Sequence, residues 1–219
     1  MDAVGLRFLP KEEEMSLAAD ITAVAFAESP FYSYIFQEPS TRVNALTWLF
    51  KQNFRMRANQ GVLRGAFSGE KMVCCFLLVP ENAAPVTFWD MLRHGLLEMP
   101  FRFGLSSVRR MLAVMQWTDK SLDALKQEHP KHFLLERMVV LPDCQGQGIG
   151  TAALTMALKE ADGSGRAVIL TTQLERNVVF YQRLGFQVVN DETFAGDGMQ
   201  IRCWTMLRCS EPACPAPVS

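Results

Sequence analysis

Apolar residues recur along this chain with two different spacings, and each spacing predicts a different kind of element. Helical spacing, with apolar positions every three or four residues, predicts helices over 12–28, 41–57, 151–161 and 175–184. Alternating or short continuous apolar runs predict strands over 4–9, 61–68, 72–80, 133–141, 167–171, 186–190 and 199–207. Gly69-Glu70 lies between two of these runs and predicts a hairpin.

The segment 81–131 shows helical spacing and no strand pattern. It predicts two or three helices inserted between strands of one domain that spans 1–209. The last residues, 210–219, contain three prolines and little apolar surface to bury. They predict a disordered tail.

Composition narrows the classes of partner. The 219 residues (24.6 kDa) suffice for one domain with a sizeable core. With 22 basic and 23 acidic residues the net charge is −1, which gives no support for nucleic acid or an anionic membrane as partner. No apolar run approaches the roughly 20 residues that span a bilayer.

Cysteine usage and the N-terminus indicate a compartment. The six cysteines form no CxxC pair and no metal-binding spacing with the three histidines, so we expect no metal site. The N-terminus has neither a basic flank nor an apolar signal core. We therefore expect reduced thiols and a cytoplasmic location.

A glycine-rich stretch between the strand predicted at 133–141 and the helix predicted at 151–161 carries the most chemistry. It reads Gln145-Gly146-Gln147-Gly148-Ile149-Gly150-Thr151. Glycine lets the backbone approach a ligand closely, and the first amides of a helix are unpaired donors beside a positive dipole end. The stretch is therefore predicted to hold a pyrophosphate.

Three classes of phosphate-bearing ligand compete for this cradle. A nucleotide-triphosphate loop needs a lysine after its last glycine, but Thr151 and Ala152 follow Gly150. A dinucleotide fold needs an acidic residue after the next strand, which ends instead in Thr171-Thr172-Gln173. Coenzyme A, with its pantetheine arm lying along a strand, is the third class.

A second motif follows the cradle at a fixed distance and supports coenzyme A. After the next predicted strand comes Asn177-Val178-Val179-Phe180-Tyr181-Gln182-Arg183-Leu184-Gly185-Phe186. The cradle and this motif together resemble the GNAT superfamily of acetyl-CoA-dependent N-acetyltransferases, from about Leu6 to Arg208. Within it the layout looks most like puromycin N-acetyltransferase and its relatives, including the long helical segment before the central strand.

The resemblance implies an α/β GNAT fold, with a mixed, mostly antiparallel central sheet flanked by helices and a helical insertion at 81–131. It implies acetyl transfer from acetyl-CoA to a primary amine by direct attack in a ternary complex. A small-molecule acceptor is preferred, in detoxification or natural-product modification, with the protein a monomer or homodimer. A protein lysine or N-terminal acetyltransferase and a non-catalytic acyl-CoA sensor are the alternatives.

The resemblance also assigns roles to residues. The backbone of Val139, Val140 and Leu141 would pair with the pantetheine amides, and the amides from Gln145 to Thr151 would bind the pyrophosphate. Asn177 and Tyr181 lie four apart on one helix and share a face. Asn177 would hydrogen-bond the pantetheine arm, and Tyr181 would protonate the departing thiolate.

A base must remove a proton from the attacking amine, and the sequence offers several. His132 directly precedes the predicted strand 133–141 and, by the two-residue period of a strand, lies on the same face as Glu136. His129 lies three residues earlier in the chain and is the third candidate. Burial within an apolar strand is a way to raise the pKa of Glu136 into a useful range. The alternative is that Glu136 forms an ion pair with Arg137 or Arg202.

Aromatic residues crowd the loop 29–38 and the helical insertion, and they predict the acceptor pocket. Phe31, Tyr32 and Trp89 are the candidates to contact an amine with an apolar or aromatic body. For each of them an ordinary place in the core is the competing interpretation. No acidic cluster accompanies them, which disfavours a polycationic acceptor.

Overall fold

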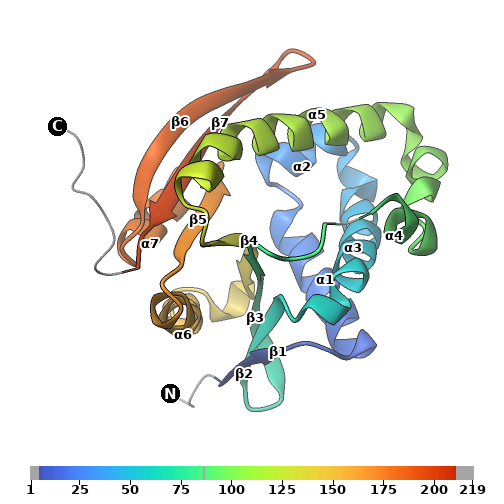
Figure 1. Cartoon of the computed structure of the whole chain (residues 1–219). Helices are drawn as coiled ribbons and strands as arrows, with labels where there is room; N and C mark the ends of the chain where they lie inside the picture. Colours follow the sequence, from blue (N-terminus) through green and yellow to red (C-terminus); the bar gives the residue numbers. More distant parts are fainter. Residues whose placement is uncertain (1–4, 86, 211–219) are drawn as a thin grey trace.

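The computed structural model of the protein describes residues 5–85 and 87–210, within which seven strands form one sheet. The strands are β1 (Gly5–Phe8), β2 (Leu63–Ser68), β3 (Lys71–Pro80), β4 (His132–Val140), β5 (Ala167–Thr172), β6 (Gln187–Gly196) and β7 (Met199–Arg208). Their order across the sheet is β1-β2-β3-β4-β5-β7-β6 (Figure 1). Among these described strands, β4 and β5 are the parallel neighbours and every other neighbouring pair is antiparallel.

The helices cover both faces of this sheet (Figure 1). They are α1 (Glu12–Phe26), α2 (Pro30–Ile35), α3 (Pro39–Met56), α4 (Phe88–Arg93), α5 (Met99–Glu128), α6 (Ile149–Gly163) and α7 (Glu175–Gln182). Short 3-10 helices occupy Ala58–Gln60, Leu96–Glu98 and Pro142–Cys144. The predicted mixed, mostly antiparallel sheet flanked by helices is confirmed.

Two hydrophobic cores lie on opposite faces of the sheet, and alternation along the strands separates them. From β3, Cys75 and Leu77 join the core under α1, α2 and α3, whereas Phe76 and Leu78 join the core under α6 and α7. Both faces of β3 are covered, so its apolar run is continuous rather than alternating. The central strands therefore lie inside the molecule.

The segment between β3 and β4 is helical, as predicted, and one helix dominates it. α5 extends along the top of Figure 1 from α4 to the β6–β7 hairpin, with non-helical backbone at Gly104. Its Arg109 and Arg110 both pair with Asp197 at the tip of that hairpin, at 2.9 and 3.1 Å. Ser121 donates to Glu192 of β6 at 2.7 Å. These contacts hold α5 against the β6–β7 hairpin, at the edge of the sheet formed by β6.

Two local predictions were wrong. The segment 29–38 contains the helix α2 rather than only loop, because Pro30 at its first turn needs no hydrogen-bond acceptor and fixes a helical φ. Strand β6 continues to Gly196 instead of ending at 190. Asp197 and Gly198 have φ of 45° and 79°, the left-handed pair that closes a two-residue hairpin.

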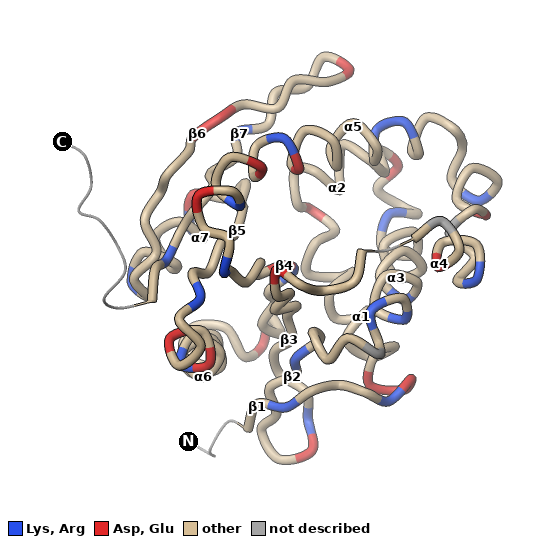
Figure 2. The backbone as a smooth tube through the Cα atoms, viewed as in Figure 1, with Lys and Arg blue, Asp and Glu red and all other residues tan. Residues whose placement is uncertain are grey.

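The predicted disordered tail falls mainly on residues 211–219, which lie outside the described residues. Ser210, its first residue, is buried. In the described part of the chain no helix is both long and apolar enough to cross a membrane. Acidic and basic positions alternate over the elements (Figure 2), in keeping with the near-zero net charge.

A stability prediction follows from the aromatic cluster that joins α2, α5 and β6. The Phe194 ring meets the rings of Phe31 and Trp117 edge-on, at centroid distances of 5.7 and 5.8 Å. Phe194→Ala should lower the free energy of unfolding by about 3–5 kcal/mol, because it leaves a cavity among these rings. Urea unfolding measures the change. Val189→Ala, at a 45% exposed position of the same strand, should change stability by less than about 0.5 kcal/mol; equal losses would contradict this account.

Candidate active site

Strands β4 and β5 separate part-way along their length. Their parallel pairing is confined to His132 with Ala167, Phe133 with Val168, and Leu134 with Ile169. Beyond Leu134, β4 continues to Val140 and β5 to Thr172 without pairing to each other. Backbone groups along the facing edges of two central strands are therefore left for another partner.

A bulge in β4 accompanies this separation. Glu136 pairs with Leu77 of β3, and Val139 pairs with Cys75, so β4 contains one residue more than β3 over this interval. Arg137 lies in the bulge with φ of 53°, a left-handed conformation that is uncommon for a residue other than glycine. A bulge bends its strand and adds twist. The end of β4 is thereby turned relative to β5.

The hydrogen bonds at the end of β4 show which backbone groups face the opening. The Leu141 amide donates to the Val73 carbonyl of β3 at 2.9 Å. Because backbone groups alternate between the two edges of a strand, Val140 directs its own amide and carbonyl toward β5. Its carbonyl accepts from the Gln145 side chain at 3.1 Å. Of the three predicted backbone contacts, Val140 is the one whose groups face the opening.

The glycine-rich stretch forms the predicted turn into a helix. Within the described chain, the amides from Gly146 to Thr151 donate to no backbone carbonyl, whereas those of Cys144 and Gln145 close the preceding turn. The Gln147 side chain donates to the Asp143 carbonyl at 2.9 Å and braces the turn. A run of unpaired donors ahead of a fifteen-residue helix is the arrangement that binds phosphate oxygens.

Two glycines of the turn are required for different reasons. Gly148 caps α6 with φ of 76°, and a Cβ there would meet nothing within 4 Å. Its side therefore opens to space that a ligand can enter. Gly150 is buried in the first turn of α6, where a Cβ would lie 3.1 Å from a methyl group of Val140. Glycine at 150 lets α6 start directly against the end of β4.

Tyr181 and Asn177 lie on α7, beside the same opening. Tyr181 is 8% exposed and packs against Phe180 and Phe186 at centroid distances of 5.1 and 5.6 Å. Burial raises the pKa of its hydroxyl, and the nearby Cys74 thiol adds to the rise. Cys74 pairs with Val140 in the sheet. The phenol therefore lies near the end of β4, in the part of the strand that no longer pairs with β5.

Asn177 fastens α7 to β5. Its amide nitrogen donates to the Thr172 hydroxyl at 3.1 Å, and the same hydroxyl accepts from the Leu174 amide at 3.5 Å. The side chain therefore fixes the corner from which α7 starts. Tyr181 follows one turn later on the same side of that helix.

Charged groups gather on the opposite face of β4, toward α2 and α3. The Glu136 carboxylate forms an ion pair with Arg137, so this part of the alternative prediction is correct, and Arg202 pairs with Asp191 instead. Arg137 also interacts with the Tyr32 hydroxyl, and its guanidinium lies 5.9 Å from the Phe50 ring centroid. Burial would lower the pKa of Arg137, but Tyr32 and Glu136 raise it above its usual value.

Arg57, at the end of α3, belongs to the same group. Burial lowers the pKa of its guanidinium, while the Glu136 carboxylate opposes that effect. The sequence pattern named Arg137 only as a candidate ion-pair partner of Glu136, and it did not point to Arg57. Arginine within otherwise apolar segments was the available signal, but only the folded chain brings α3 against the bulge.

The other candidates for base and acceptor contact are dispersed. The His132 ring donates to the His129 carbonyl at 2.8 Å, where β4 and β5 still pair. Phe31 is buried in the aromatic cluster, whereas Tyr32 packs on Phe50 at 5.3 Å and faces Arg137. Trp89 is 72% exposed on α4, at the outer side of α3 in Figure 1. The structure does not bring Trp89 to the β4 opening.

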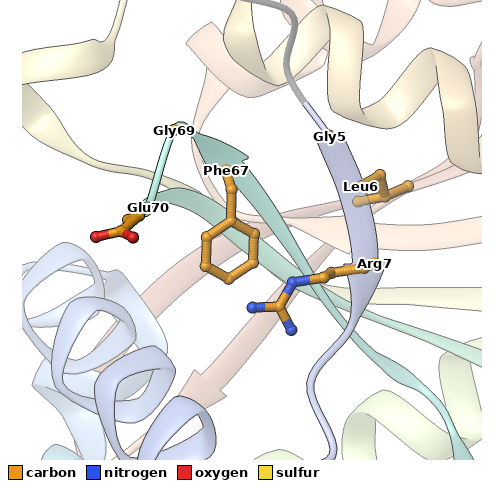
Figure 3. Close-up of a pocket in the computed structure, with 6 residues that line it drawn as sticks. All are labelled: Gly5, Leu6, Arg7, Phe67, Gly69 and Glu70. Atoms are coloured by element: carbon orange, nitrogen blue, oxygen red, sulfur yellow. The ribbon is translucent and has the colours of Figure 1, made fainter.

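A surface hollow of about 580 Å³ lies elsewhere, against β1 and the β2–β3 turn (Figure 3). Arg7 lies over the Phe67 ring at 4.1 Å and pairs with Glu14 at 2.6 Å. None of the predicted site residues is among those that line it. Among the described residues no group of three or more His, Cys, Asp or Glu gathers to hold a metal ion.

Comparison with known proteins finds a family similarity in the segment that contains the opening. Residues 115–188 match the family model for the acetyltransferase (GNAT) domain. The matched segment contains β4, the cradle, α6, β5 and α7, which together form the opening described above. This segment of the chain is similar to the GNAT acetyltransferase domain.

Solved structures share this GNAT fold across almost the whole chain. Agmatine N-acetyltransferase in its apo form has a TM-score of 0.62 and 14% identity, covering 95% of this chain and 100% of that one. The histone acetyltransferase HPA2 and related acetyltransferase from Corynebacterium glutamicum has a TM-score of 0.63 and 17% identity, covering 97% and 99%. At these identities the likeness shows the fold.

A third structural neighbour was solved with a bound cofactor. It is yncA, a putative acetyltransferase from Salmonella typhimurium, with its cofactor acetyl-CoA, at a TM-score of 0.55 and 14% identity. The match covers 99% of this chain and 100% of that one. In this chain the amides of the glycine turn donate to no backbone carbonyl.

The turn of the GNAT domain gives a second stability prediction. Gly148→Ala should lower the free energy of unfolding by about 1–2 kcal/mol, because alanine resists the left-handed conformation at φ of 76°. Urea denaturation checks the value. Gly163→Ala is the matched control at the other end of α6; its φ is not left-handed and nothing lies within 4 Å of the added Cβ. The control should be neutral or stabilising, and equal destabilisation of both would count against the role of φ.

Proposed function

We propose that this protein transfers the acetyl group of acetyl-CoA to a primary amine of a small molecule, by direct attack in a ternary complex. The observation that supports it most is the union of three features in one place. These are the strand opening beyond Leu134, the unpaired amides from Gly146 to Thr151, and the buried Tyr181 hydroxyl beside them. Backbone donors would hold the pantetheine and pyrophosphate, while the phenol would lie near the sulfur.

In this mechanism one proton transfer takes place on each face of β4, with Tyr181 on one face and Glu136 on the other. The amine nitrogen attacks the thioester carbon, and the carbon–sulfur bond then breaks. Tyr181 donates its proton to the departing sulfur and regains one from solvent. Glu136 accepts the proton that the amine loses, directly or through one water. Asn177 holds α7 so that the phenol stays in place, and its carbonyl oxygen remains to accept from a pantetheine amide.

Small amines suit this chain better than a peptide acceptor. α5 and the β6–β7 hairpin are joined by Arg109, Arg110 and Asp197, and α2 lies beneath them through the Arg110 bond to the Ile35 carbonyl. This covers the acceptor side of the sheet, whereas a peptide substrate needs an open groove. Agmatine N-acetyltransferase is among the structural neighbours. The narrower likeness to puromycin N-acetyltransferase stays a prediction.

The direct test is thiol release from acetyl-CoA with a panel of amines: arylalkylamines, aminonucleosides, polyamines, amino acids and lysine peptides. Turnover with a small amine supports the proposal. Release with peptides alone would favour the protein acetyltransferase, and acetyl-CoA binding without release from any acceptor would favour the sensor.

Tyr181→Phe should lower kcat by about 10²-fold or more, because it removes the proton donor for the leaving sulfur. The dissociation constant for acetyl-CoA, measured by calorimetry, should stay within about twofold of wild type, since the backbone supplies the main contacts. Tyr34→Phe is the control, as it removes another buried hydroxyl from α2. Unchanged turnover in Tyr181→Phe would eliminate the general-acid role.

The pH profile offers an independent check on Tyr181. Burial raises its pKa, so the phenol keeps its proton as pH rises past the ordinary value of about 10. The contribution of this acid to kcat is present below that raised pKa and lost only above it. The alkaline limb of kcat should therefore show no loss due to this group below pH ~10.

Glu136→Gln should lower kcat/KM by about 10²-fold or more at pH 7, because the amide cannot accept the proton of the amine. Glu160→Gln serves as a matched control, since Glu160 also pairs with an arginine, Arg64, at 2.9 Å, but near the end of α6. Thermal unfolding of both variants separates chemistry from folding. Equal activity in the two variants would show that Glu136 has only a structural pairing role.

A further inference from the structure

Two guanidinium groups face a single carboxylate beside the bulge of β4. Arg137 forms an ion pair with Glu136. Burial lowers the pKa of Arg57, which is also close enough for the Glu136 carboxylate to raise that pKa and for the Arg137 guanidinium to lower it. Glu136 neutralises one of the two arginines, so this group retains one positive charge in excess. Tyr32 and Phe50 provide its other walls.

Both arginines have a buried donor without a partner. Within the described residues, the Nε atoms of Arg57 and Arg137 are shielded from solvent and make no hydrogen bond. The Glu136 carboxylate engages Nη1 of Arg137, and Nη1 of Arg57 donates to Gln60 at 3.5 Å. An unmade hydrogen bond from a buried charged donor is unfavourable, so two of them on arginines that both interact with Glu136 indicate that an acceptor group belongs here.

The chemistry of that acceptor follows from the donors. The Nε–Nη edge of a guanidinium makes two parallel hydrogen bonds to a carboxylate, and the excess positive charge favours an anion. Asn53 lies one turn before Arg57 on the same side of α3, and its buried Oδ1 likewise makes no hydrogen bond. It can accept from a polar hydrogen of the same ligand.

The position of the group connects it to acetyl transfer. Arg137 lies three residues beyond Leu134, the last residue of β4 that pairs with β5. The side chains of Glu136 and Arg137 keep 30% and 22% exposure, so the outer part of this group is open to solvent while the Nε atoms lie beneath it. A ligand held here lies at the start of the opening, where an amine must meet the thioester.

We propose that the acceptor is an amino-acid-like molecule whose carboxylate is bound by Arg57 and Arg137 while its amine faces Glu136. This inference rests on the proposed function and names its substrate class. The charges of the site match those of such a zwitterion: two guanidiniums for the carboxylate and one carboxylate for the ammonium. A polyamine would place further positive charge against two arginines, which disfavours that class.

The test compares each acceptor with a partner that lacks only the anionic charge. L-phenylalanine is paired with L-phenylalaninamide, and 4-aminobutyrate with 4-aminobutanamide, in the thiol-release assay with full-length protein and acetyl-CoA. Wild type should favour one carboxylate over its amide by about tenfold to a hundredfold in kcat/KM. Arg57→Gln should bring that ratio to near one, and Arg57→Lys should restore part of it.

The matched control is Arg55→Gln, two residues earlier on α3, where the arginine pairs with Glu12 at the surface. Its carboxylate-to-amide ratio should equal that of wild type. A wild-type ratio of one or less, or a ratio unaffected by Arg57→Gln, would overturn the proposal and leave the arginines as a structural network.

Failure of the proposed function gives a different result. If no amine releases thiol, calorimetry with the products N-acetylphenylalanine and N-acetylphenylalaninamide, in the presence of coenzyme A, tests the carboxylate site directly. Tighter binding of the carboxylate, lost in Arg57→Gln, would support the site although transfer fails. Equal or absent binding of both compounds would reject it.

Discussion

The separation of β4 from β5 is the constraint on which the rest of this molecule depends. Parallel pairing stops at Leu134, and the two strands beyond it lie in the middle of a sheet rather than at its edge. Backbone groups inside a sheet are normally satisfied by the neighbouring strand. Here β4 and β5 no longer supply each other with such partners beyond Leu134, and helices cover both faces of the sheet around them (Figure 1).

The two faces of β4 provide different surroundings for Tyr181 and Glu136. Toward α6 and α7, Tyr181 lies among Phe180, Phe186 and other apolar side chains, which keeps the phenol neutral. Toward α2 and α3, Glu136 lies among arginines, where charge is tolerated because it is paired. The sheet thus separates the neutral phenol on one face from the paired charges on the other, and the proposed proton donor and proton acceptor lie in these two surroundings.

The glycine turn and the elements on either side of it are predictable from the sequence, because their signals are local. The apolar strand, the glycines from 146 to 150 and the helix that follows are adjacent in the chain, and the motif with Asn177 and Tyr181 follows at a fixed distance. The charged group around Glu136 is not predictable in this way, because it depends on strand register and helix packing. Nothing near Arg137 in sequence announces a bulge, which arises from pairing with β3, and Arg57 reaches β4 only through the packing of α3. Asp197-Gly198, by contrast, is a local hairpin signal that gives the true end of β6.

Arg137 combines an unfavourable backbone conformation with a favourable side-chain ion pair. Its φ of 53° suits glycine, and an L-residue there is less stable by about 1–2 kcal/mol. Glycine at 137 would relax the backbone, but it would also leave the Glu136 carboxylate without its ion-pair partner. A chain with glycine there would keep the opening between β4 and β5 and lose the guanidinium beside it. The left-handed backbone and the pairing of the side chain with Glu136 therefore act in opposite directions on stability at this one position.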